Sequence, residues 1–132
     1  MKNKFNGITE FLAKKTNTKD FAMIIYNKKL SVCPLTTHLP IKNVSNKINK
    51  LEIINKVKII DKFWKDKFNK NVKIGVTGLN PHCESINKVN EDKSIILPAI
   101  KELKNLKYNI DGPFAADTIF LKNNRKKFDL II

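Results

Sequence analysis

The chain of 132 residues has little of what marks several classes of protein. Its two cysteines, Cys33 and Cys83, form no CxxC pair, so their spacing indicates neither a zinc ribbon nor a particular disulfide. No apolar run reaches the roughly 18 residues that a membrane-spanning helix needs. The first residues are basic, but no apolar signal core follows them. These absences favour a cytoplasmic protein with reduced thiols and no membrane partner.

Arginine is nearly absent as well. Of the 26 basic residues only Arg125 is an arginine, and the lysines are spread along the chain without forming one block. The net charge of +14 at pH 7 would suit a nucleic-acid partner. However, specific recognition of bases and phosphates favours the planar fork of arginine. We therefore expect no specific nucleic-acid partner, and we keep a lysine-rich nucleic-acid-binding module as an alternative.

The apolar residues are arranged as alternating strands and helices. A chain of this length is expected to form one domain with a substantial core. Short apolar runs predict strands, and the first two are close enough to form an antiparallel hairpin. The four runs cover residues 21–26, 30–36, 72–77 and 128–132. Together with the helices between them, they predict an α/β fold with a partial mixed sheet flanked by helices.

Two longer segments show helical periodicity. Apolar residues at spacings of three and four predict an amphipathic helix within residues 44–68, with Ser45 as its N-cap. A second helix is predicted over residues 91–107, where Pro98 either kinks the helix or marks its first turn. Residues 111–113, Asp-Gly-Pro, predict a turn.

The only two histidines occupy similar positions. His38 lies in Thr36-Thr37-His38-Leu39-Pro40, and His82 ends Gly78-Leu79-Asn80-Pro81-His82. Each follows a strand-like run, and the loops that leave the carboxyl ends of strands in open α/β sheets bind ligands. Two neutral imidazoles on such loops could hold one divalent metal ion. Alternatively, each histidine caps its loop through a backbone hydrogen bond.

Two further residues could act at the same site. Thr9 is predicted to cap a helix over residues 10–15, where its hydroxyl and the helix amides could hold a phosphate. Asp117 follows a loop of small residues, and a carboxylate near a metal can orient a ligand or transfer a proton. The alternative for Asp117 is a helix N-cap.

Four segments together resemble the 4-hydroxythreonine-4-phosphate dehydrogenase family, in that family's order and with similar spacing. They are Gly7-Ile8-Thr9-Glu10-Phe11-Leu12-Ala13, Thr36-Thr37-His38-Leu39-Pro40, Thr77-Gly78-Leu79-Asn80-Pro81-His82 and Gly112-Pro113-Phe114-Ala115-Ala116-Asp117-Thr118. The resemblance extends from residue 7 to residue 132. It implies the central part of an isocitrate-dehydrogenase-like α/β/α fold, present here as a single partial domain over residues 1–132 that is truncated at both ends.

The resemblance also implies cofactors, partners and residue roles. The cofactors are NAD and a divalent metal (Zn²⁺, Mg²⁺ or Co²⁺), the substrate is a phosphorylated small molecule, and the enzyme is a homodimer with the metal at its interface. His38 and His82 match two of three metal-binding histidines. The third lies in a Tyr-His-Asp-Gln segment that in the family follows the strand matched here by residues 128–132. Thr9 matches a phosphate contact, and Asp117 matches an acidic residue near metal and substrate.

The activity that the resemblance implies belongs to pyridoxal 5′-phosphate (vitamin B6) biosynthesis. The family oxidises 4-(phosphooxy)-L-threonine with NAD, and loss of carbon dioxide then gives 3-amino-2-oxopropyl phosphate. Because the third histidine and most of the NAD-binding surface are missing from these residues, we expect little or no turnover by this chain alone. The alternative is a non-catalytic remnant that keeps the fold.

Overall fold

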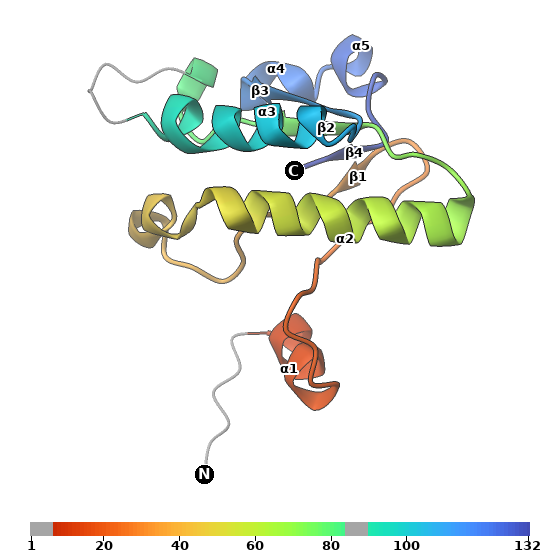
Figure 1. The fold of residues 1–132 in the computed structure, drawn as a ribbon. Helices are drawn as coiled ribbons and strands as arrows, with labels where there is room; N and C mark the ends of the chain where they lie inside the picture. The colour runs from red at the N-terminus through yellow and green to blue at the C-terminus, as the bar shows by residue number, and fades with distance from the viewer. Residues whose placement is uncertain (1–6, 84–89) are drawn as a thin grey trace.

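The structure is a computed structural model that describes residues 7–83 and 90–132 (Figure 1). Its helices and strands are α1 (Ile8–Lys15), β1 (Ser31–Val32), α2 (Lys50–Phe68), β2 (Ile74–Thr77), α3 (Leu97–Asn105), β3 (Ile110–Phe114), α4 (Ala116–Ile119), α5 (Lys122–Arg125) and β4 (Leu130–Ile131). Short helical turns are η1 (Ile41–Asn43), η2 (Ser45–Lys47), η3 (Pro81–Cys83) and the π-helical η4 (Asp92–Ile96). None of the described helices is long and apolar enough to cross a bilayer.

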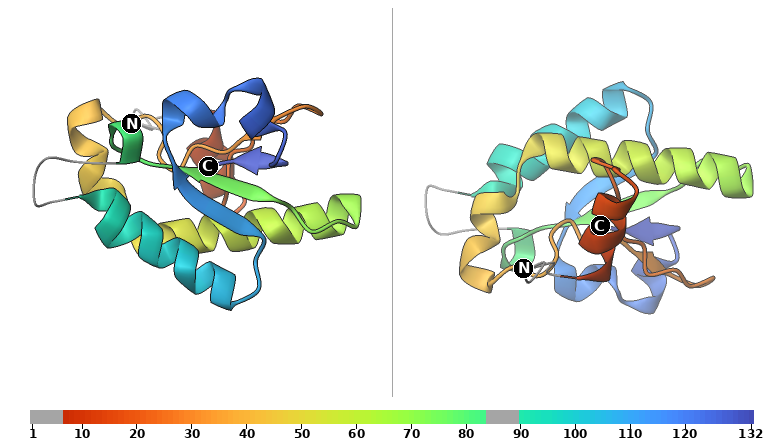
Figure 2. Two further views of the ribbon diagram at one scale, coloured as in Figure 1. Left: turned by 90° about the horizontal axis from the view of Figure 1, so that it is seen from above. Right: turned by 90° about the horizontal axis from the view of Figure 1, so that it is seen from below.

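The four strands form one parallel sheet in the order β1-β4-β2-β3. Helices α2 and α3 cover one face, and α4 and α5 lie on the other (Figure 2). The predicted α/β class with flanking helices is therefore confirmed. Within the described residues, antiparallel pairing is limited to one bridge, between Ile25 and Val32, so the predicted hairpin is a single pair of residues. Because the strands are parallel, their carboxyl ends all lie at the same end of the sheet, which we call the carboxyl edge.

Helix α2 supplies one side of the core. Its inward stripe contains the buried residues Ile53, Ile54, Val57, Ile60 and Trp64. The predicted helix is confirmed, but it begins at residue 50 and the predicted Ser45 N-cap is wrong. The cap is Asn49, whose side chain accepts a hydrogen bond from the Glu52 amide at 2.9 Å. Asn49 has the extended backbone that an N-cap needs, whereas Ser45 belongs to the 3₁₀ turn η2.

The prediction of a turn over residues 111–113 is wrong, because these residues lie inside the edge strand β3. The register with β2 shifts between Gly75 and Thr77, so the strand accommodates the Gly112–Pro113 pair as an irregularity. Proline is tolerated at a sheet edge because it removes only one backbone donor. Gly112 has φ +137°, which few other residues adopt.

Pro98 lies in the first turn of α3, which confirms the second of the two predicted outcomes. The turn before it, η4, is π-helical. A proline has no amide hydrogen to donate to the preceding turn, and a wider π turn is one way in which the chain accommodates that loss. Asp92, at the start of η4, contacts the loop that follows β2.

Candidate functional site

The candidate site residues lie beyond the carboxyl ends of three parallel strands. His38 is in the loop after β1, His82 is in η3 after β2, and Asp117 is in α4 after β3. In Figure 1 the chain leaves β1 and β2 on the same side, toward the N-terminal end of α2. The carboxyl edge is where open α/β sheets bind ligands. The strands that the sequence predicts before both histidines are therefore present.

The three loops border one apolar cavity of about 320 Å³. Thr36 comes from the His38 loop, Leu79 from the His82 loop, and Ala116 stands beside Asp117. The floor includes the ends of β1, β2 and β4, down to Ile132. A cavity of about 300 Å³ or more is within the range of small-ligand sites. The cavity is thus lined by neighbours of the candidate residues, whereas the His38, His82 and Asp117 side chains are not part of its lining.

His38 is held by a contact with α1. The Glu10 carboxylate accepts a hydrogen bond from the Thr37 hydroxyl at 2.9 Å, and the same oxygen lies 3.3 Å from Nδ1 of His38. Three hydrogen bonds lower the pKa of Glu10, with its own backbone amide making the largest contribution, followed by Thr37 and then His38. Glu10 is thus an anion at neutral pH. The hydrogen bond of His38 is to a side chain, unlike the backbone cap considered from the sequence.

Thr9 does not cap α1, so that prediction is wrong. The helix begins at Ile8, and its N-cap is Gly7, whose extended backbone immediately precedes the first helical turn. Thr9 is half-buried and lines a cavity of about 350 Å³ with residues that include Ala13 and Met23. It nevertheless stays in the first turn of the helix whose next residue, Glu10, contacts the His38 loop.

His82 and Asp117 form a second pair. Nδ1 of His82 lies 3.9 Å from a carboxylate oxygen of Asp117, and both side chains are exposed, by 74% and 60%. This distance is too long for a hydrogen bond. Both residues line a cavity of about 270 Å³ with Asn80 and Pro81. The N-cap of α4 is Ala115, so Asp117 is not the cap considered from the sequence and its carboxylate faces solvent.

Asp92 holds the loop that carries His82, and this residue was not identified from the sequence. Its carboxylate is buried and accepts hydrogen bonds from the Leu79 amide at 2.7 Å, the Asn80 amide at 3.2 Å and the Asn80 side chain at 3.0 Å. Glu91 accepts a further bond from the Asn80 side chain at 3.0 Å. An acidic residue at a helix start is common, so its position alone did not distinguish Asp92 from a solvent-exposed one.

Both histidines have a left-handed backbone, with φ of 53° at His38 and 55° at His82. This conformation costs about 1–2 kcal/mol per residue. It is less rare for histidine than for most residues, and Asn17, Asn69, Cys83 and Lys107 also adopt it here. Such strain concentrates at functional sites, where the rest of the fold maintains it. The sequence carries no signal for this shared feature.

The described side chains therefore form two pairs, Glu10 with His38 and His82 with Asp117. No group of three or more His, Cys, Asp and Glu residues within 7–83 and 90–132 is arranged to hold a metal ion. Imidazole nitrogens and carboxylate oxygens are nonetheless the donors that Zn²⁺ and Co²⁺ accept. The donor chemistry fits a divalent metal, with two histidines available from this chain.

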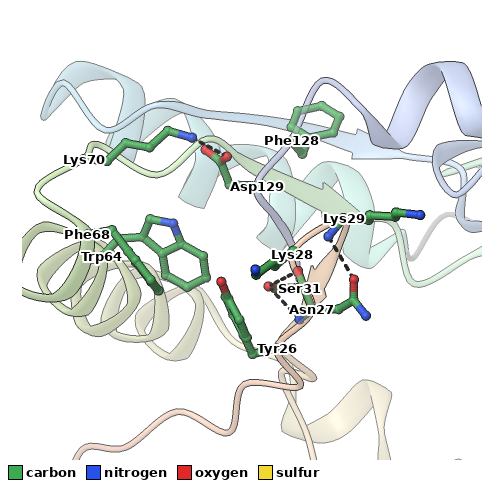
Figure 3. A pocket seen from close by; sticks show the side chains of 10 residues that line it. All are labelled: Tyr26, Asn27, Lys28, Lys29, Ser31, Trp64, Phe68, Lys70, Phe128 and Asp129. Carbon is green, nitrogen blue, oxygen red and sulfur yellow. Dashed lines mark hydrogen bonds and ion pairs between the residues drawn. The ribbon is translucent and has the colours of Figure 1, made fainter.

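A cavity of about 230 Å³ lies at the opposite, amino end of the strands (Figure 3). Tyr26 stacks on Phe68 with ring centroids 5.9 Å apart, and Lys70 pairs with Asp129 at 2.6 Å across the opening. The Asp129 carboxylate also accepts a hydrogen bond from the Lys73 amide at 2.9 Å. Because its aromatic rings stack and its carboxylate is already paired, we assign this cavity to packing at the amino end of the sheet.

Comparisons with known proteins show which proteins the chain is similar to. A 4-hydroxythreonine-4-phosphate dehydrogenase of Sulfurihydrogenibium sp. is 40% identical over 97% of this chain and 40% of its own length. One of Aquifex aeolicus is 42% identical over 89% of this chain and 37% of its own length. A D-threonate 4-phosphate dehydrogenase of Pectobacterium atrosepticum is 30% identical over 97% of the chain. The chain thus spans about 40% of the length of the curated relatives it matches.

Solved structures share the fold. The crystal structure of 4-hydroxythreonine-4-phosphate dehydrogenase from Klebsiella pneumoniae superposes with a TM-score of 0.85 at 29% identity, and covers 98% of this chain and 40% of that one. A terephthalate dihydrodiol dehydrogenase from Burkholderia xenovorans, at 18% identity and a TM-score of 0.78, shows the fold alone. The family of pyridoxal phosphate biosynthetic protein PdxA matches residues 1–132, and the chain belongs to this family.

Proposed function

We propose that this chain is part of an NAD-dependent, metal-assisted dehydrogenase that oxidises and decarboxylates 4-(phosphooxy)-L-threonine in pyridoxal 5′-phosphate biosynthesis. The hydroxyl-bearing carbon gives a hydride to NAD, and the hydroxyl loses a proton. The carboxylate then leaves as carbon dioxide, and the carbon it leaves takes up a proton. The product is 3-amino-2-oxopropyl phosphate. Two relatives named 4-hydroxythreonine-4-phosphate dehydrogenase are 40% and 42% identical to the chain, whereas two named for D-threonate 4-phosphate are 32% and 30% identical.

The observation that carries the proposal is that His38, His82 and Asp117 follow the carboxyl ends of three parallel strands, and that their neighbours Thr36, Leu79 and Ala116 line one cavity. In the proposal the two histidines hold the metal. A bound divalent metal polarises the substrate hydroxyl and favours its ionisation. We assign proton exchange with bound substrate or water to Asp117, which is exposed and lies 3.9 Å from His82.

The other assignments concern substrate and partners. We assign Thr9 and the amides of the first turn of α1 to the substrate phosphate, because a helix N-terminus attracts anions. With two histidines in this chain, a metal keeps coordination positions for another ligand. The family resemblance supports a homodimer that supplies it at the interface. We place the protein in the cytoplasm with its small-molecule substrate.

Metal binding by the 132-residue chain tests the proposal most directly. Titration with Co²⁺, followed by its visible absorption, should show one site that His38→Ala and His82→Ala each weaken at least tenfold. Asp66→Asn, on the exposed side of α2, is the control and should bind like the wild type. Unchanged binding in both histidine variants would contradict the proposed metal site.

Turnover separates the alternatives. With 4-(phosphooxy)-L-threonine, NAD and Zn²⁺, Mg²⁺ or Co²⁺, we expect slow NADH production or none from this chain alone. A non-catalytic remnant would also lack the metal site, whereas an incomplete enzyme would keep it. Faster turnover of D-threonate 4-phosphate would instead favour the activity of the more distant relatives. DNA binding that is steeply salt-dependent and sequence-selective would favour the nucleic-acid alternative.

A further inference from the structure

The contact between Glu10 and His38 joins two segments that are 28 positions apart in the sequence. Helix α1 has no buried residue, and Figure 1 shows it apart from the other helices, on the side of the sheet where β1 lies. One oxygen of Glu10 accepts a hydrogen bond from the Thr37 hydroxyl at 2.9 Å and lies 3.3 Å from Nδ1 of His38. The carboxylate of α1 therefore engages two consecutive side chains of the loop after β1.

This contact distinguishes the two nitrogens of the imidazole. An ionised carboxylate can only accept hydrogen bonds, so the nitrogen that faces it must carry the proton. In the neutral ring the other nitrogen, Nε2, then keeps its lone pair. Metal-binding histidines commonly have this arrangement, in which a carboxylate holds one ring nitrogen and the metal binds the other.

The ring is also confined sterically. A Cβ placed on Gly7 would collide with Cε1 of His38 and would lie 3.0 Å from Nδ1 and 2.9 Å from Oε2 of Glu10. Gly7 has an extended backbone that any residue adopts, so the glycine is needed here for space and not for conformation. Oε2 of Glu10 is shielded from solvent and has no hydrogen-bond partner among the described residues. The imidazole thus packs between the Gly7 backbone and the Glu10 carboxylate.

His82 lacks an equivalent restraint within the described residues. Among the described residues, the carboxylate of Asp117 lies 3.9 Å from His82, beyond hydrogen-bond distance, and 74% of the His82 side chain is exposed. The His38 side chain is 46% exposed. The two histidines therefore provide an internal comparison between a ring that is held and one that is not.

We infer that Glu10 is a positioning residue for the metal site: its carboxylate fixes the Nδ1–H tautomer and the ring orientation of His38, so that Nε2 is presented as the metal ligand. This inference rests on the proposed function, because it assigns a donor atom within the proposed metal site. Loss of such a carboxylate partner typically weakens metal affinity by about 10–100-fold. The same range is expected for Glu10→Ala.

The tautomer is measurable without metal or substrate. Long-range ¹H–¹⁵N spectra of the imidazoles contain only two ring systems, and His82→Ala identifies which one is His38. In spectra recorded at about pH 8.5, we expect His38 in the Nδ1–H form. Glu10→Ala should shift it toward the Nε2–H form, and Glu10→Gln, which keeps an acceptor oxygen, should restore it in part.

Affinity for Co²⁺ is measured in parallel. Glu10→Ala and Gly7→Ala should each weaken binding about 10–100-fold, the first by releasing the ring and the second by displacing it. Glu52→Ala is the matched control, because Glu52 has the same position in α2, three residues after the N-cap, but contacts no histidine in any described hydrogen bond. It should leave both the tautomer and the affinity unchanged.

The possible outcomes separate the inference from the proposed function. If Glu10→Ala changes neither tautomer nor affinity while His38→Ala still abolishes binding, the inference is overturned and the metal site stands. If His38→Ala itself leaves Co²⁺ binding intact, both fail. Fluorescence of the single tryptophan, Trp64, during urea unfolding checks that each variant folds; because α1 has no buried residue, the core should keep its unfolding midpoint.

Discussion

Replacement of Asp92 by alanine should loosen the His82 loop and destabilise the whole chain. The buried carboxylate accepts three hydrogen bonds, two of them from the backbone amides of Leu79 and Asn80. Hydrogen bonds to a charged group are each worth about 1.5–3 kcal/mol. Leu79 and Asn80 are half-buried, so water replaces part of what is lost, and removal of a buried charge relieves its desolvation. We therefore expect a loss of about 2–4 kcal/mol.

Urea unfolding followed by fluorescence measures this loss, because the single tryptophan, Trp64, is only 5% exposed in the folded chain. Asp92→Asn should cost less, about 1–2 kcal/mol, because it keeps one acceptor oxygen but turns an amide donor toward another donor. Asp66→Ala is the control. Asp66 is exposed on α2, the helix that also holds Trp64, and its replacement should change stability by no more than about 0.5 kcal/mol.

A second measurement links Asp92 to the site. In native conditions, where Asp92→Asn is still folded, Co²⁺ binding should weaken because the loop that carries His82 is no longer fixed at Leu79 and Asn80. If Asp92→Ala unfolds at the same urea concentration as Asp66→Ala, the carboxylate does not hold the loop and the reasoning is refuted. If stability falls but metal affinity does not change, the loop is held but has no part in metal binding.

Three other predictions test the fold and its ionisable groups. Gly112→Ala should destabilise by more than about 1 kcal/mol, because φ is +137° and the new Cβ would lie 2.5 Å from a carbonyl oxygen of β2; an unchanged urea midpoint would contradict this. The hydrogen bond from Lys104 lowers the pKa of Asp111 from its ordinary 3.8. The wild type should therefore be more stable than Asp111→Asn above pH 3.8 and should lose that advantage as the pH falls through the lowered pKa. A stability difference that does not change with pH would contradict the role of this ion pair. Burial raises the pKa of the Cys33 thiol, so a thiol reagent should label half-buried Cys83 first and Cys33 only on unfolding; fast labelling of both in the native chain would disprove it.

Local patterns were sufficient wherever one element's own residues decide its structure. The long amphipathic helix and the strands before each histidine follow from periodicity and apolar runs. The same patterns misplaced boundaries and caps. Ser45 and Thr9 are good capping residues by type, but Asn49 and Gly7 have the backbone conformation just before the first helical turn. Residue type alone does not specify that conformation.

The strand β3 shows more clearly what local sequence patterns cannot predict. Asp-Gly-Pro is a turn signal in isolation, yet pairing with β2 draws these residues into the sheet edge. Partners across a parallel sheet are distant in the sequence, so no local window contains the pairing that decides the outcome. The same holds for the sheet order, in which the last strand, β4, lies between β1 and β2.

The residue types of the candidate site could be read from the printed chain, because only two histidines are present and both follow predicted strands. Their surroundings could not. The carboxylate of Glu10 reaches His38 across 28 positions, Asp92 reaches Leu79 across 13, and both histidines adopt a left-handed backbone. Composition and periodicity determine which segments form helices and strands, since those depend on neighbouring residues. Which side chains meet at the carboxyl edge depends on how the segments pack, and only the folded arrangement decides that.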